Sequence, residues 1–120
     1  MERLTNQEED VMMMVWRKGP CFIKEVWEEL DEPRMPYTTL ASVFKNLERK
    51  GYLAGKKRGG SYEYTPLISA DDYSSSAIGR LVSNFFGNSY QSMVSFFAHR
   101  EEVSEQELKE IIDMMNQNQQ

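Results

Sequence analysis

The chain has few of the residues that build covalent or metal-linked structure. In 120 residues it contains one cysteine, Cys21, and one histidine, His99. A single cysteine cannot form an internal disulfide, and one cysteine with one histidine cannot supply the four protein ligands of a structural zinc site. The sequence therefore indicates no metal and no cofactor, and no small-molecule ligand is evident.

A long hydrophobic run is also missing. No segment approaches the ~20 apolar residues of a membrane-spanning helix. The start of the chain, MERLTNQEED, is polar and acidic and lacks the apolar core of a secretory signal. We expect a cytoplasmic protein without membrane insertion.

No group of residues has the arrangement of a catalytic site. Gly59-Gly60 is too short for a phosphate-binding loop and does not open a helix. Glu25 and Glu29 lie four residues apart on an open helix face with no partner nucleophile, and His99 lies at a helix end beside a cation. We predict that the protein is not an enzyme.

Hydrophobic residues make up 40% of the chain, enough for one domain or a small domain with an accessory segment. The net charge of -5 is unevenly distributed. Residues 34–58 contain seven cations against one acid, a charge of +6, whereas the residues from Pro66 onward have a charge of -5. A basic patch on an acidic body can bind a nucleic acid duplex on one side and repel it on the other.

The stretch from Tyr37 to Gly51, YTTLASVFKNLERKG, has the periodicity of a helix with one buried face. Its apolar positions recur at i, i+3, i+4 and i+7, at Leu40, Val43, Phe44 and Leu47. The opposite face has hydroxyls, an amide and cations, at Thr38, Thr39, Ser42, Lys45, Asn46 and Arg49. Such groups can hydrogen-bond base edges and phosphates in a DNA major groove. Taken alone, an ordinary solvated face is the commoner explanation of this pattern.

The segment after this helix favours a recognition helix. Gly51 can end the helix in the left-handed conformation. Two short aromatic-containing runs then flank Gly59-Gly60, a pair that favours a tight hairpin. Lys56, Lys57 and Arg58 lie next to the tip of this hairpin. A helix followed by a basic-tipped hairpin is typical of a winged helix.

The N-terminal part supplies the remaining elements. Thr5 and Glu8 have capping-box spacing at the start of a helix that Gly19-Pro20 ends. A short extended link at Cys21-Phe22, a second helix over about Ile23 to Leu30 and a proline-containing turn precede the recognition helix. This order predicts a mainly α, α+β winged helix-turn-helix fold.

Three amphipathic helices are predicted after Pro66, over about 70–86, 89–99 and 105–115, and we expect the tail from Asn116 to Gln120 to fray. Their apolar stripes need a surface to pack against. A homodimer interface is the simplest such surface, because the two-fold symmetry of a dimer matches that of a palindromic DNA operator. The alternative is a monomer in which these helices fold back on the DNA-binding domain. The predicted dimerisation residues are Ile78, Leu81, Val82, Phe85, Tyr90, Met93, Val94, Phe97, Leu108, Ile111, Ile112 and Met115.

Five segments have a likeness to known proteins: LTNQEEDVMMMVW, YTTLASVFKNLERKGYL, YEYTP, ISADDY and SEQELKEI. Through them the chain resembles the penicillinase-repressor (BlaI/MecI) family of bacterial transcription regulators over nearly its whole length. The resemblance implies a winged-helix DNA-binding domain, a helical dimerisation domain and repression at an inverted-repeat operator. It also implies derepression by proteolysis, triggered by a membrane-bound sensor with a zinc metallopeptidase domain.

The resemblance also implies roles for single residues. Thr38, Thr39 and Ser42 look like base-reading residues, and Lys45, Arg49, Lys57 and Arg58 look like phosphate contacts. With Asn46 and Lys50 they form the predicted DNA-binding set. Members commonly have Thr at position 42 and Arg at position 46. The family's inactivating cut falls at an Asn-Phe bond, and the corresponding candidate cleavage region here reads Ser95-Phe96-Phe97.

We predict a DNA-binding domain over residues 1–66 and a dimerisation domain over residues 67–120. The predicted function is a homodimeric transcriptional repressor that binds double-stranded operator DNA, with a membrane-bound sensor protease as a further partner. A different class of function, a protein-interaction module that uses a winged-helix fold without DNA, is the alternative.

Overall fold

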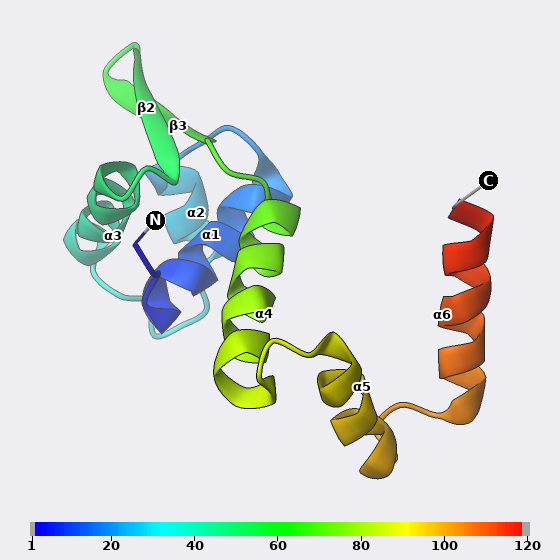
Figure 1. Ribbon diagram of the computed structural model, residues 1–120. Coiled ribbons are helices and arrows are strands. Elements are labelled where there is room, and N and C mark those ends of the chain that lie inside the picture. Colours follow the sequence, from blue (N-terminus) through cyan, green and yellow to red (C-terminus); the bar gives the residue numbers. More distant parts are fainter. Residues whose placement is uncertain (1, 119–120) are drawn as a thin grey trace. The chain divides into compact units, whose positions relative to one another are not determined.

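The computed structural model describes residues 2–118. The described chain contains six helices and a three-stranded antiparallel sheet (Figure 1). The order of elements is α1 (Asn6–Lys18), β1 (Cys21–Phe22), α2 (Ile23–Glu29), α3 (Tyr37–Arg49), β2 (Leu53–Arg58), β3 (Ser61–Pro66), α4 (Ala70–Phe86), α5 (Tyr90–His99) and α6 (Glu105–Asn118). This confirms the predicted α+β winged-helix fold.

The chain divides into two compact units between Ser74 and Ser75, within α4. Each unit is therefore described by itself. The predicted DNA-binding domain spans residues 1–66 and the predicted dimerisation domain spans residues 67–120. These two domains are defined by function, and the assignment stays a prediction.

The core of the first unit lies between α1, α2, α3 and the sheet. The apolar stripe predicted for α3 is buried, with Leu40, Phe44 and Leu47 fully inaccessible to solvent and Val43 5% exposed. Further buried side chains come from the other elements: Val11, Met12, Val15, Cys21, Val26, Leu53 and Tyr64. The ring centroids of Phe44 and Tyr64 lie 5.1 Å apart, so α3 packs directly on β3.

The sheet has the strand order β1-β3-β2, and both pairings are antiparallel. Arg58 pairs with Ser61 across a two-residue turn in which Gly59 has a φ of 62°. This confirms the predicted hairpin, because a tight turn of this kind needs a positive φ that glycine adopts at little cost. Strands β2 and β3 form the wing, which extends from the body of this unit in Figure 1.

The helix ends follow the signals in the sequence. In α1 the Thr5 hydroxyl accepts from the Glu8 N–H at 3.1 Å, and the Glu8 carboxylate accepts from the Thr5 N–H at 2.8 Å, which confirms the capping box. Gly51 ends α3 with a φ of 88°. Ser104 and Glu107 make the same reciprocal pair of bonds at the start of α6.

The first turn of α4 belongs to the first unit and is fixed to α1. The indole N–H of Trp16 donates to the carbonyl of Ile68 at 2.8 Å, and the Tyr73 hydroxyl donates to the Glu9 carboxylate. The Tyr73 ring also packs against the rings of Trp16 and Tyr52, with centroids 5.6 and 5.8 Å apart. The segment after the wing is thereby held on the surface of α1.

The second unit contains the rest of α4 together with α5 and α6. The rings of Phe86 and Phe96 meet edge to face at 5.6 Å, so the end of α4 contacts α5. Helix α6 continues to Asn118, three residues beyond the last apolar position of its predicted stripe, and no glycine or proline interrupts it. The predicted fraying of the tail from Asn116 stays a prediction. Residues 119 and 120 lie outside the described part of the chain.

Of the helices that residues 2–118 form, none is both long enough and apolar enough to cross a membrane.

Candidate nucleic-acid interface

Helix α3 presents a polar face to solvent opposite its buried stripe. All six residues predicted on this face are exposed: Thr38, Thr39, Ser42, Lys45, Asn46 and Arg49. The Ser42 hydroxyl donates to the Thr38 carbonyl one turn earlier at 3.1 Å. Because a hydroxyl has one donor and two acceptor positions, Ser42 keeps acceptor capacity toward solvent in this state.

The wing adds cations beside this face. Lys56, Lys57 and Arg58 are exposed on β2, and among the described residues neither lysine side chain has a hydrogen-bond or ion-pair partner. Arg58 differs, because its Nε atom lies 3.1 Å from a carboxylate oxygen of Glu63 on β3. The two lysine ammonium groups are therefore available to an external anion.

A pocket of about 260 Å³ lies between the wing, α3 and the start of α2. Its walls are aromatic and cationic: Phe22, Ile23, Lys24, Tyr37, Lys45, Gly60, Ser61, Tyr62 and Tyr64. Lysine and tyrosine side chains are among those that contact the phosphates of DNA. Lys24, Tyr37 and Tyr62 are not among the residues predicted from the sequence, because only the folded chain brings the start of α2 next to the wing.

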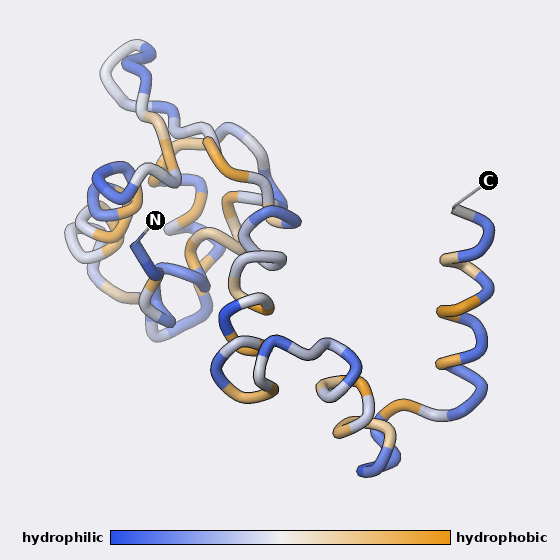
Figure 2. The backbone as a smooth tube through the Cα atoms, viewed as in Figure 1, coloured by the Kyte–Doolittle hydropathy of each residue, from blue (hydrophilic) through white to orange (hydrophobic). Residues whose placement is uncertain are grey.

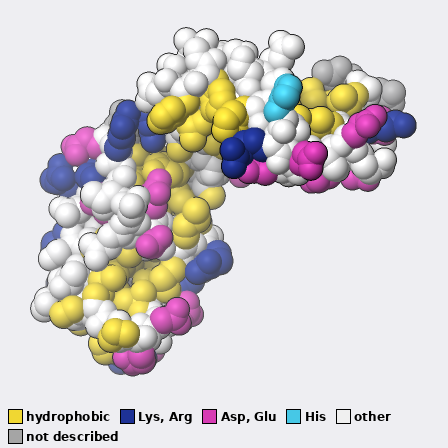
Figure 3. Space-filling view, turned by 90° about the horizontal axis from the view of Figure 1, so that it is seen from below, with side chains coloured by type: hydrophobic (Ala, Val, Ile, Leu, Met, Phe, Trp, Pro, Cys, Tyr) yellow, Lys and Arg dark blue, Asp and Glu magenta, His cyan; other side chains and the backbone are white. Residues whose placement is uncertain are grey.

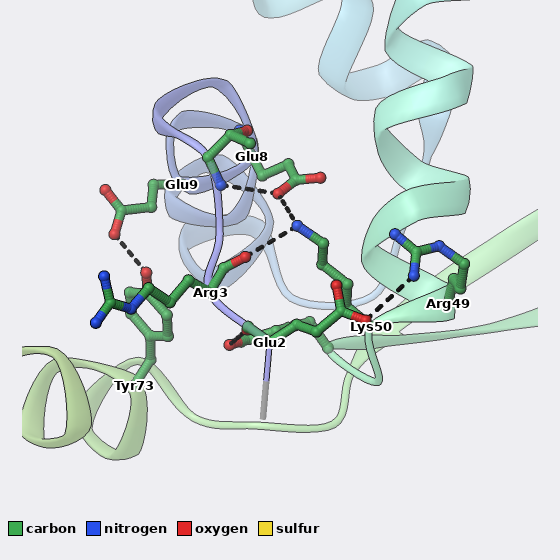
Figure 4. A network of polar contacts seen from close by, with 9 residues as sticks. Glu2, Arg3, Glu8, Glu9, Arg49, Lys50 and Tyr73 are labelled. Atoms are coloured by element: carbon green, nitrogen blue, oxygen red, sulfur yellow. Dashed lines mark hydrogen bonds and ion pairs between the residues drawn. The ribbon is translucent and has the colours of Figure 1, made fainter.

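Lys50 is placed differently from the other residues of the predicted DNA-binding set. Its Nζ atom lies 2.6 Å from Glu8 Oε1, and the two side chains are only 9% and 6% exposed. The same ammonium donates to the carbonyl of Arg3 at 2.9 Å (Figure 4). Lys50 thus joins the end of α3 to the N-terminal segment and to α1, and this placement gives no support to a role in DNA contact.

Arg49 also has an intramolecular partner. Its guanidinium lies 3.2 Å from Glu2 Oε1, and both side chains are 59% exposed (Figure 4). An ion pair with this exposure is weak, because water screens it and two long side chains must be ordered to form it. Arg49 therefore stays accessible at the end of the polar face of α3.

Buried titratable groups in this unit have shifted pKa values. Burial alone raises the pKa of Glu8, but the Lys50 ammonium and hydrogen bonds from Thr5 lower it by more, so its pKa lies below the ordinary value of 4.5. Burial, with a smaller effect of the Glu25 carboxylate, raises the pKa of Cys21 to about 11. The Cys21 thiol is therefore protonated at neutral pH and is a poor nucleophile.

Most of the predicted dimerisation residues are exposed in the single chain. Phe85 is 77% exposed, Ile112 56% and Met115 55%, and Ile78, Leu81, Tyr90, Val94 and Ile111 are also exposed. Met93, Phe97 and Leu108 are half-buried. Val82 differs from the rest, because it is 1% exposed and therefore already covered within the chain.

These exposed apolar residues are not scattered singly along the chain. Figure 2 shows hydrophobic positions along one side of α6 and hydrophilic positions along the other. On the face displayed in Figure 3, hydrophobic side chains are open to solvent in several places. Exposed apolar surface of this kind is typical of surfaces at which proteins associate.

The candidate cleavage region, Ser95-Phe96-Phe97, lies inside α5. The carbonyl of Ser95 is 2.8 Å from Nδ1 of His99, and the Arg100 guanidinium lies over the Phe96 ring, 5.6 Å from its centroid. The side chain of Phe96 is 47% exposed. Cleavage here stays a prediction.

The fold and this surface define a winged-helix protein with an exposed polar and cationic face on α3 and the wing. The model of the family described as Penicillinase repressor matches residues 4–117. The chain therefore belongs to the penicillinase repressor family, a family of transcriptional repressors, which is not a class of enzymes.

Individual relatives agree with this assignment. The chain is similar to the penicillinase repressor of Bacillus licheniformis, with 25% identity over 116 residues that cover 96% of this chain and 91% of that protein. It is 26% identical to the penicillinase repressor of Staphylococcus aureus, over 91% of this chain and 87% of that protein. It is also 22% identical to the methicillin resistance regulatory protein MecI of Mammaliicoccus sciuri, over 94% of this chain and 93% of that protein.

Proposed function

We propose that this protein is a homodimeric winged-helix repressor that binds an inverted-repeat DNA operator in the cytoplasm. The observation that carries the proposal is the exposed polar face of α3 next to Lys56 and Lys57 of the wing, which have no side-chain partner among residues 2–118. Family membership and two relatives named as penicillinase repressors support it.

In this proposal α3 enters the major groove. Thr38, Thr39, Ser42 and Asn46 face the base edges, where hydroxyl and amide groups discriminate between base pairs. Lys45 and Arg49 contact the phosphates on either side. Lys50 is left out of the proposed contacts because its ammonium is buried against Glu8.

The wing lies along the sugar-phosphate backbone. Lys57 and Arg58 approach a phosphate, and the pocket between the wing and α3 receives the backbone, with Lys24 and Lys45 on its walls. Contacts of this kind fix the register of the protein on the duplex without reading its sequence. The acidic C-terminal part of the chain is repelled by DNA, which favours one docking orientation.

We propose that the exposed apolar residues of α4, α5 and α6 form the dimer interface. A second copy of the chain is the natural occupant, because a two-fold dimer presents two recognition helices to the two half-sites of an inverted repeat. Val82 is excluded from this interface, since it is already buried within one chain.

We also propose that derepression involves a membrane-bound sensor with a metallopeptidase domain, with Ser95-Phe96-Phe97 as the candidate cut. This step rests on family membership. Because the three residues are in the middle of α5, and a protease needs an extended substrate, the helix must unwind locally before cleavage. Co-expression with such a protease, followed by mass spectrometry of the fragments, tests the step.

The experiment that tests the proposed function is binding to the DNA upstream of the protein's own gene and to a random duplex of equal length, across a salt series. We expect tight binding to the upstream duplex, two chains per duplex and a steep loss of affinity as salt rises, because phosphate contacts release counterions. Equal weak binding to both duplexes, or none, would favour the protein-interaction module instead.

A further inference from the structure

The N-terminal segment lies across the end of the recognition helix and is held there by two residues that follow Arg49. The Lys50 ammonium donates to the carbonyl of Arg3 at 2.9 Å, and the Tyr52 hydroxyl donates to the carbonyl of Glu2 at 2.8 Å. We call residues 2–5 the N-terminal strap. Figure 4 shows the strap passing between the start of α1 and the end of α3.

The strap is anchored on the buried ion pair between Lys50 and Glu8, whose side chains are 9% and 6% exposed. One oxygen of Glu8, Oε1, accepts both from the Lys50 ammonium at 2.6 Å and from the N–H of Thr5 at 2.8 Å. Thr5 is also the cap of α1. The Glu8–Lys50 pair, which lies between the start of α1 and the end of α3, therefore also holds the backbone of the strap at Arg3 and Thr5.

This fixed backbone carries the Glu2 carboxylate to the Arg49 guanidinium, at 3.2 Å. A carboxylate and a phosphate compete for the same N–H groups of an arginine, because both are anions whose oxygens accept hydrogen bonds from the guanidinium. Both side chains are 59% exposed, so the pair is weak enough for a phosphate to displace. The second arginine of the proposed interface, Arg58, is paired in the same way with Glu63, whereas Lys45, Lys56 and Lys57 have no such partner among residues 2–118.

We propose that the N-terminal strap is an autoinhibitory element in which Glu2 occupies the phosphate-binding position of Arg49 until DNA displaces it. This rests on the proposed function, since it takes Arg49 as a phosphate contact. The strap lowers the affinity for every duplex, because a phosphate carries no base sequence. The cost of displacing Glu2 is the same for operator and non-operator DNA, so the strap lowers both affinities by the same factor and leaves their ratio unchanged.

The test compares Glu2→Gln with the wild type in a fluorescence titration with a random duplex at low salt. The substitution keeps the shape of the side chain and removes its charge. We expect affinity to rise by about two- to five-fold, the range of an exposed ion pair, and the logarithmic salt slope to steepen by about one phosphate contact. The matched control is Asp10→Asn, which removes an exposed acidic charge of α1 that has no partner among the described residues.

The arginine variant separates the strap from a general effect of charge. In an Arg49→Ala background, Glu2→Gln should change affinity no more than Asp10→Asn does. An unchanged or lower affinity of Glu2→Gln, or an equal gain in the Arg49→Ala background, would overturn the strap while leaving the proposed function intact. If neither the wild type nor Glu2→Gln binds any duplex, both proposals fail.

Discussion

The Nζ atom of Lys50 lies 2.6 Å from Oε1 of Glu8, and this ion pair joins the last turn of α3 to the first turn of α1 across 42 positions of sequence. Both side chains are almost completely buried. Removing two charges from water costs several kcal/mol per ion, so neither group tolerates the loss of its partner. The pair fixes the end of α3 on the body of the first unit.

We expect Lys50→Met to destabilise the fold by about 3 kcal/mol, because Glu8 is left buried without a counter-charge. The free energy of unfolding in urea measures this effect. Lys45→Met is the matched control, since Lys45 is exposed and has no ion-pair partner among residues 2–118, and it should change stability by less than about 0.5 kcal/mol. Equal stabilities of the two variants would contradict the structural role of Lys50.

The same pair predicts a dependence of stability on pH. The pKa of Glu8 in the folded state lies below its ordinary value of 4.5, so its contribution is present above pH 4.5 and is lost as the pH falls through the folded-state pKa. The difference in unfolding free energy between the wild type and Glu8→Gln should therefore be large at pH 7 and smaller near pH 3. A difference that stays constant between these two pH values would show that the charge of Glu8 is not what stabilises the pair.

Two substitutions on α3 should separate base reading from phosphate contact. Ser42→Ala should cost about 1 to 3 kcal/mol of binding free energy at the operator and almost nothing on random DNA. Lys45→Ala should weaken binding to both duplexes alike and reduce the salt slope by about one. Titrations of both duplexes across a salt series measure the two effects, and equal losses on operator and random DNA for Ser42→Ala would remove Ser42 from the base-reading residues.

A charge on the apolar side of α6 should break the proposed dimer. Ile112 is 56% exposed in the single chain, and burying a glutamate at this position in an interface would leave an unpaired charge. Sedimentation equilibrium should give a dimer for the wild type and a monomer for Ile112→Glu. The control Gln117→Glu adds the same charge at an exposed polar position of α6 and should remain dimeric. A monomeric wild type would favour the fold-back alternative.

Two glycines of the wing should respond differently to alanine. A Cβ atom at Gly55 would lie 2.9 Å from Cε1 of Tyr64 and 3.1 Å from Oε2 of Glu48, which accepts a hydrogen bond from the Gly55 N–H. We expect Gly55→Ala to cost about 1 to 3 kcal/mol of stability through overpacking. A Cβ atom at Gly60 would meet no atom within 4 Å, so Gly60→Ala should leave the stability nearly unchanged. Thermal unfolding of the two variants measures the difference, and similar midpoints would contradict the close packing of β2 on β3.

The sequence by itself determined the elements whose signals are local. The spacing of Leu40 to Leu47 indicated the buried stripe of α3, the Thr5 and Glu8 pair indicated the start of α1, and Gly59-Gly60 indicated the wing turn. Each signal depends on residues within one or two turns of each other, and periodicity, capping and turn chemistry act over that range. The helical periodicity of residues 37–51 also indicated which residues of α3 are exposed.

Only the tertiary structure decided what each cation does. Lys50 follows Arg49 directly and both belong to the predicted DNA-binding set, but Lys50 is buried against Glu8 while Arg49 is exposed beside Glu2. Likewise, Val82 shares an apolar stripe with Phe85, yet one is covered and the other is 77% exposed. Burial and ion pairing depend on which distant segment packs nearby, and residues 42 or 47 positions apart leave no local pattern that would reveal it.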